Sequence, residues 1–512
     1  MRLLGLLIPT ALSAVLYGLS FPPTRLRLLA WVALIPLFAA IRRAGAGGAL
    51  LLAWVWTVVA AYVVGAWFPR SVSTYYQQPV VVGVAFFLGV SSLMAAPYYM
   101  AFAACYRRLA RAPTTLIPVL AGAAWAGSEL ARVKVGGNPW AISGYSQIGI
   151  SPLVQIADVA GVHGMGFLVA AVNAALLETW RAVRGDSRQL RGALAGVAIV
   201  AAALTLALGY GVFRLRSPVV GSDARPIKVA MVQGNLDLGS QWQQEFYGRN
   251  LDVYLRLTRN VLLESSPAMV FWPENALTFL LADEPLYRAA IGRLLAPSGA
   301  QLLAGGVRSD GARPPRYYNS VFLLSPEGTI VGWYDKQRLV PFAEYFPFAG
   351  LEFLQRRFAR VRVFTPGADA PLLPTAAGPA GVTICNEAMF PEIPAAHVRD
   401  GATYLVDPAN DTWLSPAFSA QQFEIVSLRT VEQRRYLVRA STSGPSAIVD
   451  PYGRVVMRTE FFRQTAIAGE IRPLTVRTVY SRVGDLFGVL CAATALGACL
   501  SPALRDRAEE PR

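Results

Sequence analysis

The sequence is poor in charged side chains, in histidine and in cysteine. Only 15% of its 512 residues are charged whereas 54% are hydrophobic, which excludes an ordinary soluble protein of this length. The two histidines, His163 and His397, have no partner at metal-ligand spacing, so we expect no metal site, no cofactor and no histidine-based triad. Three of the four cysteines, Cys105, Cys491 and Cys499, lie in apolar runs. We expect them to be small hydrophobic packing residues without a disulfide framework.

Long apolar runs account for the high hydrophobic content. They lie at about 3–20, 28–41, 47–67, 80–105, 114–131, 159–179, 192–213 and 486–504. Most are long enough to cross a bilayer core of about 30 Å as helices. The fifth run carries Glu129 near its end, and we expect Glu129 with Trp125 to brace the following loop, NPW at 138–140. The sequence therefore predicts a polytopic α-helical membrane protein of about eight spans, with seven helices in 1–213 and the last span with its cytoplasmic tail in 486–512.

The basic residues are distributed in short clusters beside these runs. The formal net charge of +15 comes from 47 Lys+Arg against 32 Asp+Glu. Clusters of this kind indicate membrane topology and anionic lipid, and we expect no nucleic-acid partner. With the N-terminus on the cytoplasmic side, the inner loops carry more arginine than the outer ones. The charge bias therefore predicts a multi-pass protein of the inner (cytoplasmic) membrane whose long segment 214–485 faces the periplasm.

Segment 214–485 has the pattern of an α/β domain. Amphipathic stretches at about 241–265, 284–297 and 416–433 alternate with short β-branched runs, and the turn sequences SPEG (325–328) and DPYG (450–453) mark hairpins. The predicted strands are IKVAMVQ, AMVFW, QLLAGGV, SVFLLSP, TIVGWY, GVTIC, TYLVDP, YLVRAS, SAIVD and AIAGEI. We expect these elements to form an α/β domain with a well-filled core.

Three polar residues follow predicted strands, where open α/β sheets usually place their chemistry. Glu274 follows AMVFW, Lys336 follows TIVGWY and Cys385 ends GVTIC. Each could singly be a solvated or packing residue. Together they suffice for acyl transfer without histidine, because a carboxylate can take the thiol proton and an ammonium stabilises the negative charge. The set predicts Cys385 as nucleophile, Glu274 as base and Lys336 as electrostatic clamp.

At these residues the sequence resembles the nitrilase superfamily, whose members use a Glu-Lys-Cys triad in an αββα sandwich. Predicted spans on both sides of the domain narrow the resemblance to its membrane-embedded branch, the apolipoprotein N-acyltransferases. The resemblance covers nearly the whole chain, through NPW (138–140), GYSQ (144–147), VQGN (232–235), WPEN (272–275), DKQRLVPFAEYFPF (335–348), ICNE (384–387), NDTW (410–413) and RASTSG (439–444). It implies an α/β fold class, a nitrilase-like αββα sandwich inserted between transmembrane helices.

The resemblance also implies supporting roles near the triad. Glu344 resembles the family's additional active-site carboxylate, and Glu387 resembles the acid after the cysteine that supports the active-site residues from outside. Trp242 follows VQGN in the same order as in the family. Two departures are visible. Asn386 stands where the family commonly has an aromatic residue, and Thr442-Ser443 where it often has asparagines. Neither departure removes a member of the triad.

The reaction that this resemblance implies has two halves. A phospholipid donates an acyl chain to the thiol, and the α-amine of a diacylglyceryl-cysteine at the N-terminus of an apolipoprotein then accepts it. The expected partners are therefore phospholipid, diacylated apolipoprotein and the lipid bilayer, and we expect a monomer. A basic amphipathic segment at 345–362 is predicted to be a membrane-facing arm, whose walls for the acyl chain are Phe346, Phe348, Leu351 and Phe353.

Two other functions stay open on the sequence. A membrane-anchored amidase of the nitrilase type would share the triad and differ only in its acceptor. A transporter or flippase with a passive outer domain would need charge inside the membrane at a helix break. Only Glu129, near the membrane edge, approaches that pattern.

Overall fold

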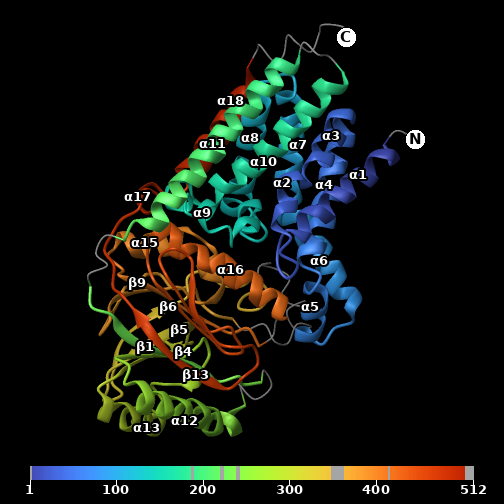
Figure 1. Ribbon diagram of the computed structural model, residues 1–512. Helices are drawn as coiled ribbons and strands as arrows, with labels where there is room; N and C mark the ends of the chain where they lie inside the picture. Colours follow the sequence, from blue (N-terminus) through green and yellow to red (C-terminus); the bar gives the residue numbers. More distant parts are fainter. Residues whose placement is uncertain are drawn as a thin grey trace. The chain divides into compact units, whose positions relative to one another are not determined.

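The chain forms two compact units in the computed structural model (Figure 1). The structure describes residues 3–185, 189–219, 224–237, 243–346, 363–412 and 415–501. Unit 1 is made of residues 1–73, 79–217 and 483–512, and unit 2 of residues 74–78 and 218–482. Helices dominate unit 1, whereas both sheets belong to unit 2.

Unit 1 has a helix in each of the predicted apolar runs. Its helices are α1 (Leu4–Leu19), α2 (Ala30–Ala33), α3 (Ile35–Arg43), α4 (Ala46–Val64), α5 (Phe68–Tyr76, which continues into unit 2), α6 (Val80–Met94), α7 (Ala96–Leu109), α8 (Ile117–Lys134), α9 (Ser151–Val154), α10 (Ala157–Arg184), α11 (Leu190–Arg216) and α18 (Leu486–Leu500). Within the described ranges, only α4, α10 and α11 are singly long and apolar enough to cross a membrane. The pair α6 and α7, bent by 43°, adds a fourth candidate. The count of eight spans is therefore not confirmed.

The second predicted span is broken, and a buried amide stabilises the break. Helix α2 ends at Ala33 and α3 begins at Ile35. Asn173 of α10 accepts a hydrogen bond from the Leu34 backbone N–H at 2.8 Å and donates one to the Ala30 carbonyl at 2.9 Å. These bonds satisfy backbone groups that a helix end leaves unpaired. The break depends on a residue about 140 positions away, so the local pattern gave no sign of it.

Glu129 and Trp125 contact Ser143, three residues beyond the predicted NPW, and Arg132 contacts NPW itself. Glu129 is fully buried, and its carboxylate accepts hydrogen bonds from the backbone N–H and the hydroxyl of Ser143, at 2.7 and 2.8 Å. The Trp125 indole N–H donates to the same hydroxyl at 3.1 Å. Arg132 donates to the carbonyl of Trp140, the last residue of NPW. Glu129 thus holds Ser143, the first residue of the 3-10 helix Ser143–Gln147.

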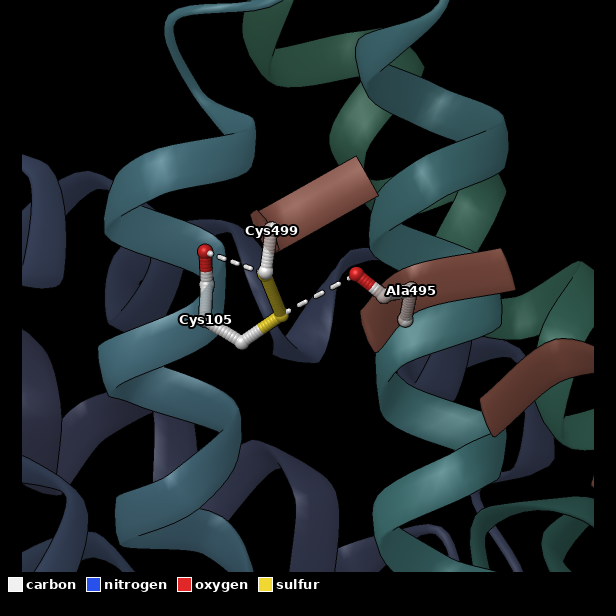
Figure 2. Close-up of a disulfide and its surroundings, with 3 residues drawn as sticks. All are labelled: Cys105, Ala495 and Cys499. Carbon is white, nitrogen blue, oxygen red and sulfur yellow. Dashed lines mark hydrogen bonds between the residues drawn. A yellow bond between two sulfur atoms is a disulfide. The ribbon is translucent and has the colours of Figure 1, made fainter. Parts of the chain in front are cut away.

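The prediction that Cys105 and Cys499 only pack was wrong, because the two form a disulfide (Figure 2). Their Cα atoms are 6.0 Å apart, within the range that a disulfide spans. Cys105 lies in α7 and Cys499 in α18, at a sequence separation of 394 residues. Cys491 is free and buried, as expected of a packing residue. Sequence spacing could not reveal the pair, because the packing of α18 against α7 and α8 brings it together.

We expect the double variant Cys105→Ala/Cys499→Ala to lower the free energy of unfolding by about 2–5 kcal/mol, as loss of a native disulfide commonly does. The disulfide ties the last helix to a helix that precedes unit 2 in the chain. Thermal unfolding in detergent, without reductant, measures the effect. Cys491→Ala is the matched control and should shift the midpoint far less. Equal midpoints for the wild type and the double variant would contradict a stabilising disulfide.

Unit 2 contains two sheets. The first has the order β13-β1-β2-β4-β5-β6, with β3 paired to β4, and the second has the order β12-β11-β10-β9-β8-β7. The strands are β1 (Ile227–Gln233), β2 (Met269–Phe271), β3 (Leu277–Leu280), β4 (Gln301–Ser309), β5 (Tyr317–Leu324), β6 (Ile330–Asp335), β7 (Leu373–Thr375), β8 (Gly378–Val382), β9 (Tyr404–Ala409), β10 (Leu437–Ser441), β11 (Ala447–Val449), β12 (Val455–Arg458) and β13 (Thr465–Ile471). Each of the ten predicted strands has an observed counterpart, and β3, β7 and β12 were not predicted. The prediction for GVTIC was wrong at its end, because β8 ends at Val382 and Cys385 lies three residues beyond it.

The two sheets form the inner layers of unit 2 and helices form its outer layers (Figure 1). A core that includes Val229, Phe271 and Val406 lies between the sheets, and a second core that includes Tyr254 and Trp272 lies between the first sheet and its helices. Those helices are α12 (Tyr247–Ser265) and α13 (Pro285–Leu295), and the second sheet packs against α15 (Glu392–Arg399) and α16 (Pro416–Gln433). Helix α17 (Val479–Val483) lies where unit 2 ends in the sequence. The predicted nitrilase-like α/β fold is confirmed.

Candidate active site

Glu274 lies three residues beyond β2, in a segment that packs closely on β4. A Cβ atom at Gly305 of β4 would come within 2.6 Å of the Glu274 Cα, so only glycine allows this approach. The Glu274 side chain is 5% exposed, and one of its oxygens accepts the backbone N–H of Asn410 at 2.9 Å. The Asn410 contact joins the first sheet's Glu274 to the loop after β9 of the second sheet. The carboxylate is thereby fixed before any substrate arrives.

Lys336 follows β6 directly and makes ion pairs with two carboxylates. Its Nζ atom lies 3.2 Å from an oxygen of Glu274 and 3.0 Å from an oxygen of Glu344. The Asn319 amide donates to the same two carboxylates, at 2.7 and 2.6 Å. Glu344 also accepts the Val340 backbone N–H at 2.7 Å. The structure therefore brings together the predicted base, the predicted clamp and the additional acid, and adds Asn319 to them.

The ammonium charge of Lys336 is stabilised by its neighbours. The side chain is 1% exposed, and burial alone would favour its neutral form. The negative charges of Glu274 and Glu344 outweigh this burial and hold the pKa of Lys336 above its ordinary value. A cation that persists at neutral pH in a buried site can stabilise an oxyanion without having to be protonated first.

Cys385 begins a short 3-10 helix, Cys385–Met389, and has a positive φ of 56°. Such backbone is uncommon for a residue with a Cβ and occurs mainly where function demands it. Burial and the negative charge of Glu274 raise the pKa of the Cys385 thiol well above its ordinary value, against the charge of Lys336. The resting sulfur is therefore a thiol. The sulfur becomes a nucleophile when a base takes its proton. Glu274 is close enough for its charge to act on the Cys385 thiol.

Glu387 organises the loop that follows Lys336. One of its oxygens accepts the backbone N–H groups of Gln337 and Arg338, at 2.6 and 3.0 Å. The other accepts the Ile384 N–H at 2.8 Å, and the Tyr334 hydroxyl also donates to the carboxylate. Glu387 thus joins the segment that carries the lysine to the segment that carries the cysteine.

The two departures from the family pattern have defined contacts. Asn386 donates through its side chain to the Arg338 carbonyl at 3.2 Å, in the same loop that Glu387 supports. The Thr442 hydroxyl donates to the backbone carbonyl of Glu274 at 3.4 Å. Both residues therefore support segments of the site and contribute no charged group. Trp242, Phe348, Leu351 and Phe353 lie outside the described residues.

Several site residues were missed from the sequence: Asn319 on β5, Asp407 on β9, Arg439 on β10, Gln422 on α16 and Asp411 in the loop after β9. Asp407 and Arg439 sit in predicted apolar strands, and all five side chains are at most 1% exposed. A polar residue inside an apolar strand was the available signal, since burial of such a group requires a partner. No group of three or more His, Cys, Asp or Glu residues in the described part of the chain is arranged to hold a metal ion.

Stability should depend on pH through Glu387. Burial raises the pKa of this carboxyl to about 7, against the opposing effect of the backbone N–H donors. A glutamate in an unfolded chain titrates near ~4.3. Between these values the folded state binds a proton that the unfolded state has lost. The stability that Glu387 contributes is therefore fully present below pH ~4, falls as the pH rises, and is lost above pH ~7, by at most about 4 kcal/mol.

Unfolding of the wild type and of Glu387→Gln between pH 4 and 8 measures this effect, because the glutamine does not titrate. We expect the wild type to lose stability relative to the variant as the pH rises. Other titrating groups, such as Asp407, are common to both proteins and cancel in the difference. A difference that stays constant over this range would show that Glu387 titrates alike in the folded and unfolded chain.

Comparisons with known proteins identify the family of the chain. The family model of the apolipoprotein N-acyltransferase N-terminal domain matches residues 13–175, and that of carbon-nitrogen hydrolase matches residues 228–480. The chain is 36% identical to the apolipoprotein N-acyltransferase of Geobacter metallireducens, over 97% of this chain and 94% of the relative. It is 32% identical to that of Azotobacter vinelandii (91% and 89%) and 30% identical to that of Pseudomonas aeruginosa (97% and 95%). The chain belongs to the apolipoprotein N-acyltransferase family.

Proposed function

We propose that the protein transfers an acyl chain from a membrane phospholipid, through a thioester at Cys385, to the N-terminal amine of a diacylglyceryl-cysteine in apolipoproteins. One observation carries the residue assignment. Lys336 is buried and forms ion pairs with Glu274 and Glu344. The charges of Lys336 and Glu274 both act on the buried thiol of Cys385. Membership of the family supplies the substrate class.

In the first half-reaction Glu274 takes the thiol proton as the Cys385 sulfur attacks the ester carbonyl carbon. The ammonium of Lys336 stabilises the oxyanion of the tetrahedral intermediate. The C–S bond persists, the ester C–O bond breaks, and Glu274 returns the proton to the leaving oxygen, which gives lysophospholipid. Asn319 donates a hydrogen bond to each of the two carboxylates that pair with the ammonium of Lys336.

In the second half-reaction the lipoprotein amine attacks the thioester carbonyl. A C–N bond forms, the C–S bond breaks, and the sulfur leaves as a thiolate. Glu274 accepts the proton that the amine loses and returns it to the sulfur, so that the enzyme ends as it began. Thiolate is a good leaving group, which makes a thioester a suitable intermediate for amide formation.

The membrane setting is part of the same proposal. The arginine asymmetry favours eight spans, with both termini in the cytoplasm and residues 214–485 in the periplasm, between a helical part at 1–213 and a last span at 486–512. The segment 345–362 is proposed as the arm that conducts the acyl chain. Each CH₂ exposed to water costs about 0.8 kcal/mol, so a long chain requires a continuous apolar path. Of the four proposed wall residues, Phe346 belongs to the part of the chain that the structure describes. The centroid of its ring lies 5.9 Å from that of the Phe342 ring.

Transfer from vesicles tests the function. The purified protein is mixed with phospholipid labelled in its acyl chain and with a synthetic peptide that begins with diacylglyceryl-cysteine. We expect a labelled, hydroxylamine-stable amide on the peptide, together with lysophospholipid. The N-acetylated form of the peptide is the control and should stay unlabelled. Free labelled fatty acid, with no labelled peptide, would favour a hydrolytic amidase and overturn the proposed acceptor.

A further inference from the structure

We propose that Gln422 is a further catalytic residue, whose side-chain amide donates a hydrogen bond to the Cys385 sulfur and stabilises negative charge there. Gln422 lies on α16, and its Nε2 atom is 3.6 Å from the Cys385 Sγ. Its side chain is completely buried. This inference rests on the proposed function, in which that sulfur is the acylated atom.

The orientation of the Gln422 amide is fixed by its other neighbour. Arg439 donates from Nη2 to the Gln422 Oε1 at 2.8 Å. A guanidinium has only donors, so the amide atom that faces it must be the oxygen. The amide nitrogen then faces the sulfur. The flip that is normally ambiguous for glutamine is therefore excluded by chemistry.

Arg439 is itself locked in place. It forms ion pairs with Asp407, which is its register partner on the neighbouring parallel strand β9, and with Asp411 at 3.1 Å. The Ser441 hydroxyl also donates to Asp411, at 2.9 Å. All three charged side chains are at most 1% exposed. The position of Gln422 is thus determined by a buried network that needs no rearrangement when the sulfur changes charge.

A neutral donor is useful here because most charges around the sulfur are negative. Glu274, Asp407 and Asp411 disfavour the thiolate, and Lys336 favours it. Other charged groups near these residues are Glu344, beside Lys336, Glu387, two residues after Cys385, and Arg439, behind Gln422. Helix α16 also carries Glu424 and the ion pair of Arg429 with Glu432. Both half-reactions place negative charge on the sulfur, first as it attacks and then as it leaves. A hydrogen bond from an amide stabilises that charge without adding another ion to the site.

The test compares Gln422→Met with the wild type, both with Cys491→Ala so that Cys385 is the only free cysteine. Methionine keeps the volume and removes the donor. The rate of alkylation by iodoacetamide is followed against pH in detergent, without lipid substrate. We expect the midpoint for Cys385 to rise by about 1 pH unit, and acylation by phospholipid vesicles to slow about tenfold, as loss of one charge-assisted hydrogen bond predicts. Gln433→Met is the matched control, because Gln433 is buried on the same helix and neither of its amide atoms has a hydrogen-bond partner in the described structure.

A second variant keeps the inference testable if Gln422→Met does not fold. Gln422→Glu retains the acceptor for Arg439 but places a negative charge beside the sulfur, and should raise the midpoint further. An unchanged midpoint in the folded variants would overturn the role of Gln422. A midpoint that depends on Gln422 in a protein that never acquires an acyl group would support the hydrogen bond and contradict the proposed function instead.

Discussion

Glu274→Gln is expected to slow formation of the acyl-enzyme by about a thousandfold, within the usual range for loss of a general base. The Cys385 thiol is buried and its pKa is raised, so little thiolate exists without a base. Glutamine preserves the shape of the side chain, and Glu344 remains as a partner for Lys336. The loss should therefore appear in the rate of acylation while the fold is kept.

The pH dependence distinguishes a lost base from a distorted site. Acylation of the variant should continue to rise with pH as hydroxide forms the thiolate, whereas acylation of the wild type should level off. Single-turnover acylation from labelled phospholipid, measured between pH 6 and 10, provides both profiles. Acylation of the variant at the wild-type rate at neutral pH would exclude Glu274 as the base.

Lys336→Met is expected to abolish acylation and to lower the free energy of unfolding of unit 2 by about 3–5 kcal/mol. This is the usual cost of leaving buried charge unpaired. Lys336 is 1% exposed and lies within 3.2 Å of Glu274 and 3.0 Å of Glu344. Without the ammonium these two carboxylates face each other through Asn319 alone. Thermal unfolding and the acylation assay measure the two effects separately.

The double variant Lys336→Met/Glu344→Gln separates stability from catalysis. Removal of one of the two carboxylates should recover much of the lost stability, because the repulsion is gone. Acylation should stay absent, since the oxyanion still lacks its cation. Recovery of both properties would mean that Lys336 only neutralises Glu344 and has no part in the chemistry.

The sequence predicted most of unit 2 because its strands follow strong local patterns. Runs such as IKVAMVQ and YLVRAS are buried in the observed β1 and β10. Glu274, Lys336 and Cys385 were identifiable because each lies at the end of such a run or two residues beyond it. β3, β7 and β12, each of three or four residues, were missed. β2 and β11 are equally short but were predicted, because the runs AMVFW and SAIVD extend beyond them.

The features that were missed depend on contacts between distant residues. The break at Leu34 depends on Asn173, the disulfide on the packing of α18, and the orientation of Gln422 on Arg439. None of these pairs shares a spacing that a local pattern could reveal. Each becomes visible only when packing brings two buried polar or sulfur-bearing groups into contact.

The central claim is that Cys385 carries the acyl chain, and the intact mass of the purified protein after incubation with phospholipid tests it most directly. We expect one added acyl group, removed by hydroxylamine and consumed when the diacylglyceryl-cysteine peptide is added. Cys385→Ala should show no adduct, whereas Cys491→Ala, which retains the nucleophile, should show the normal yield. A hydroxylamine-sensitive adduct of normal yield on Cys385→Ala would contradict the account.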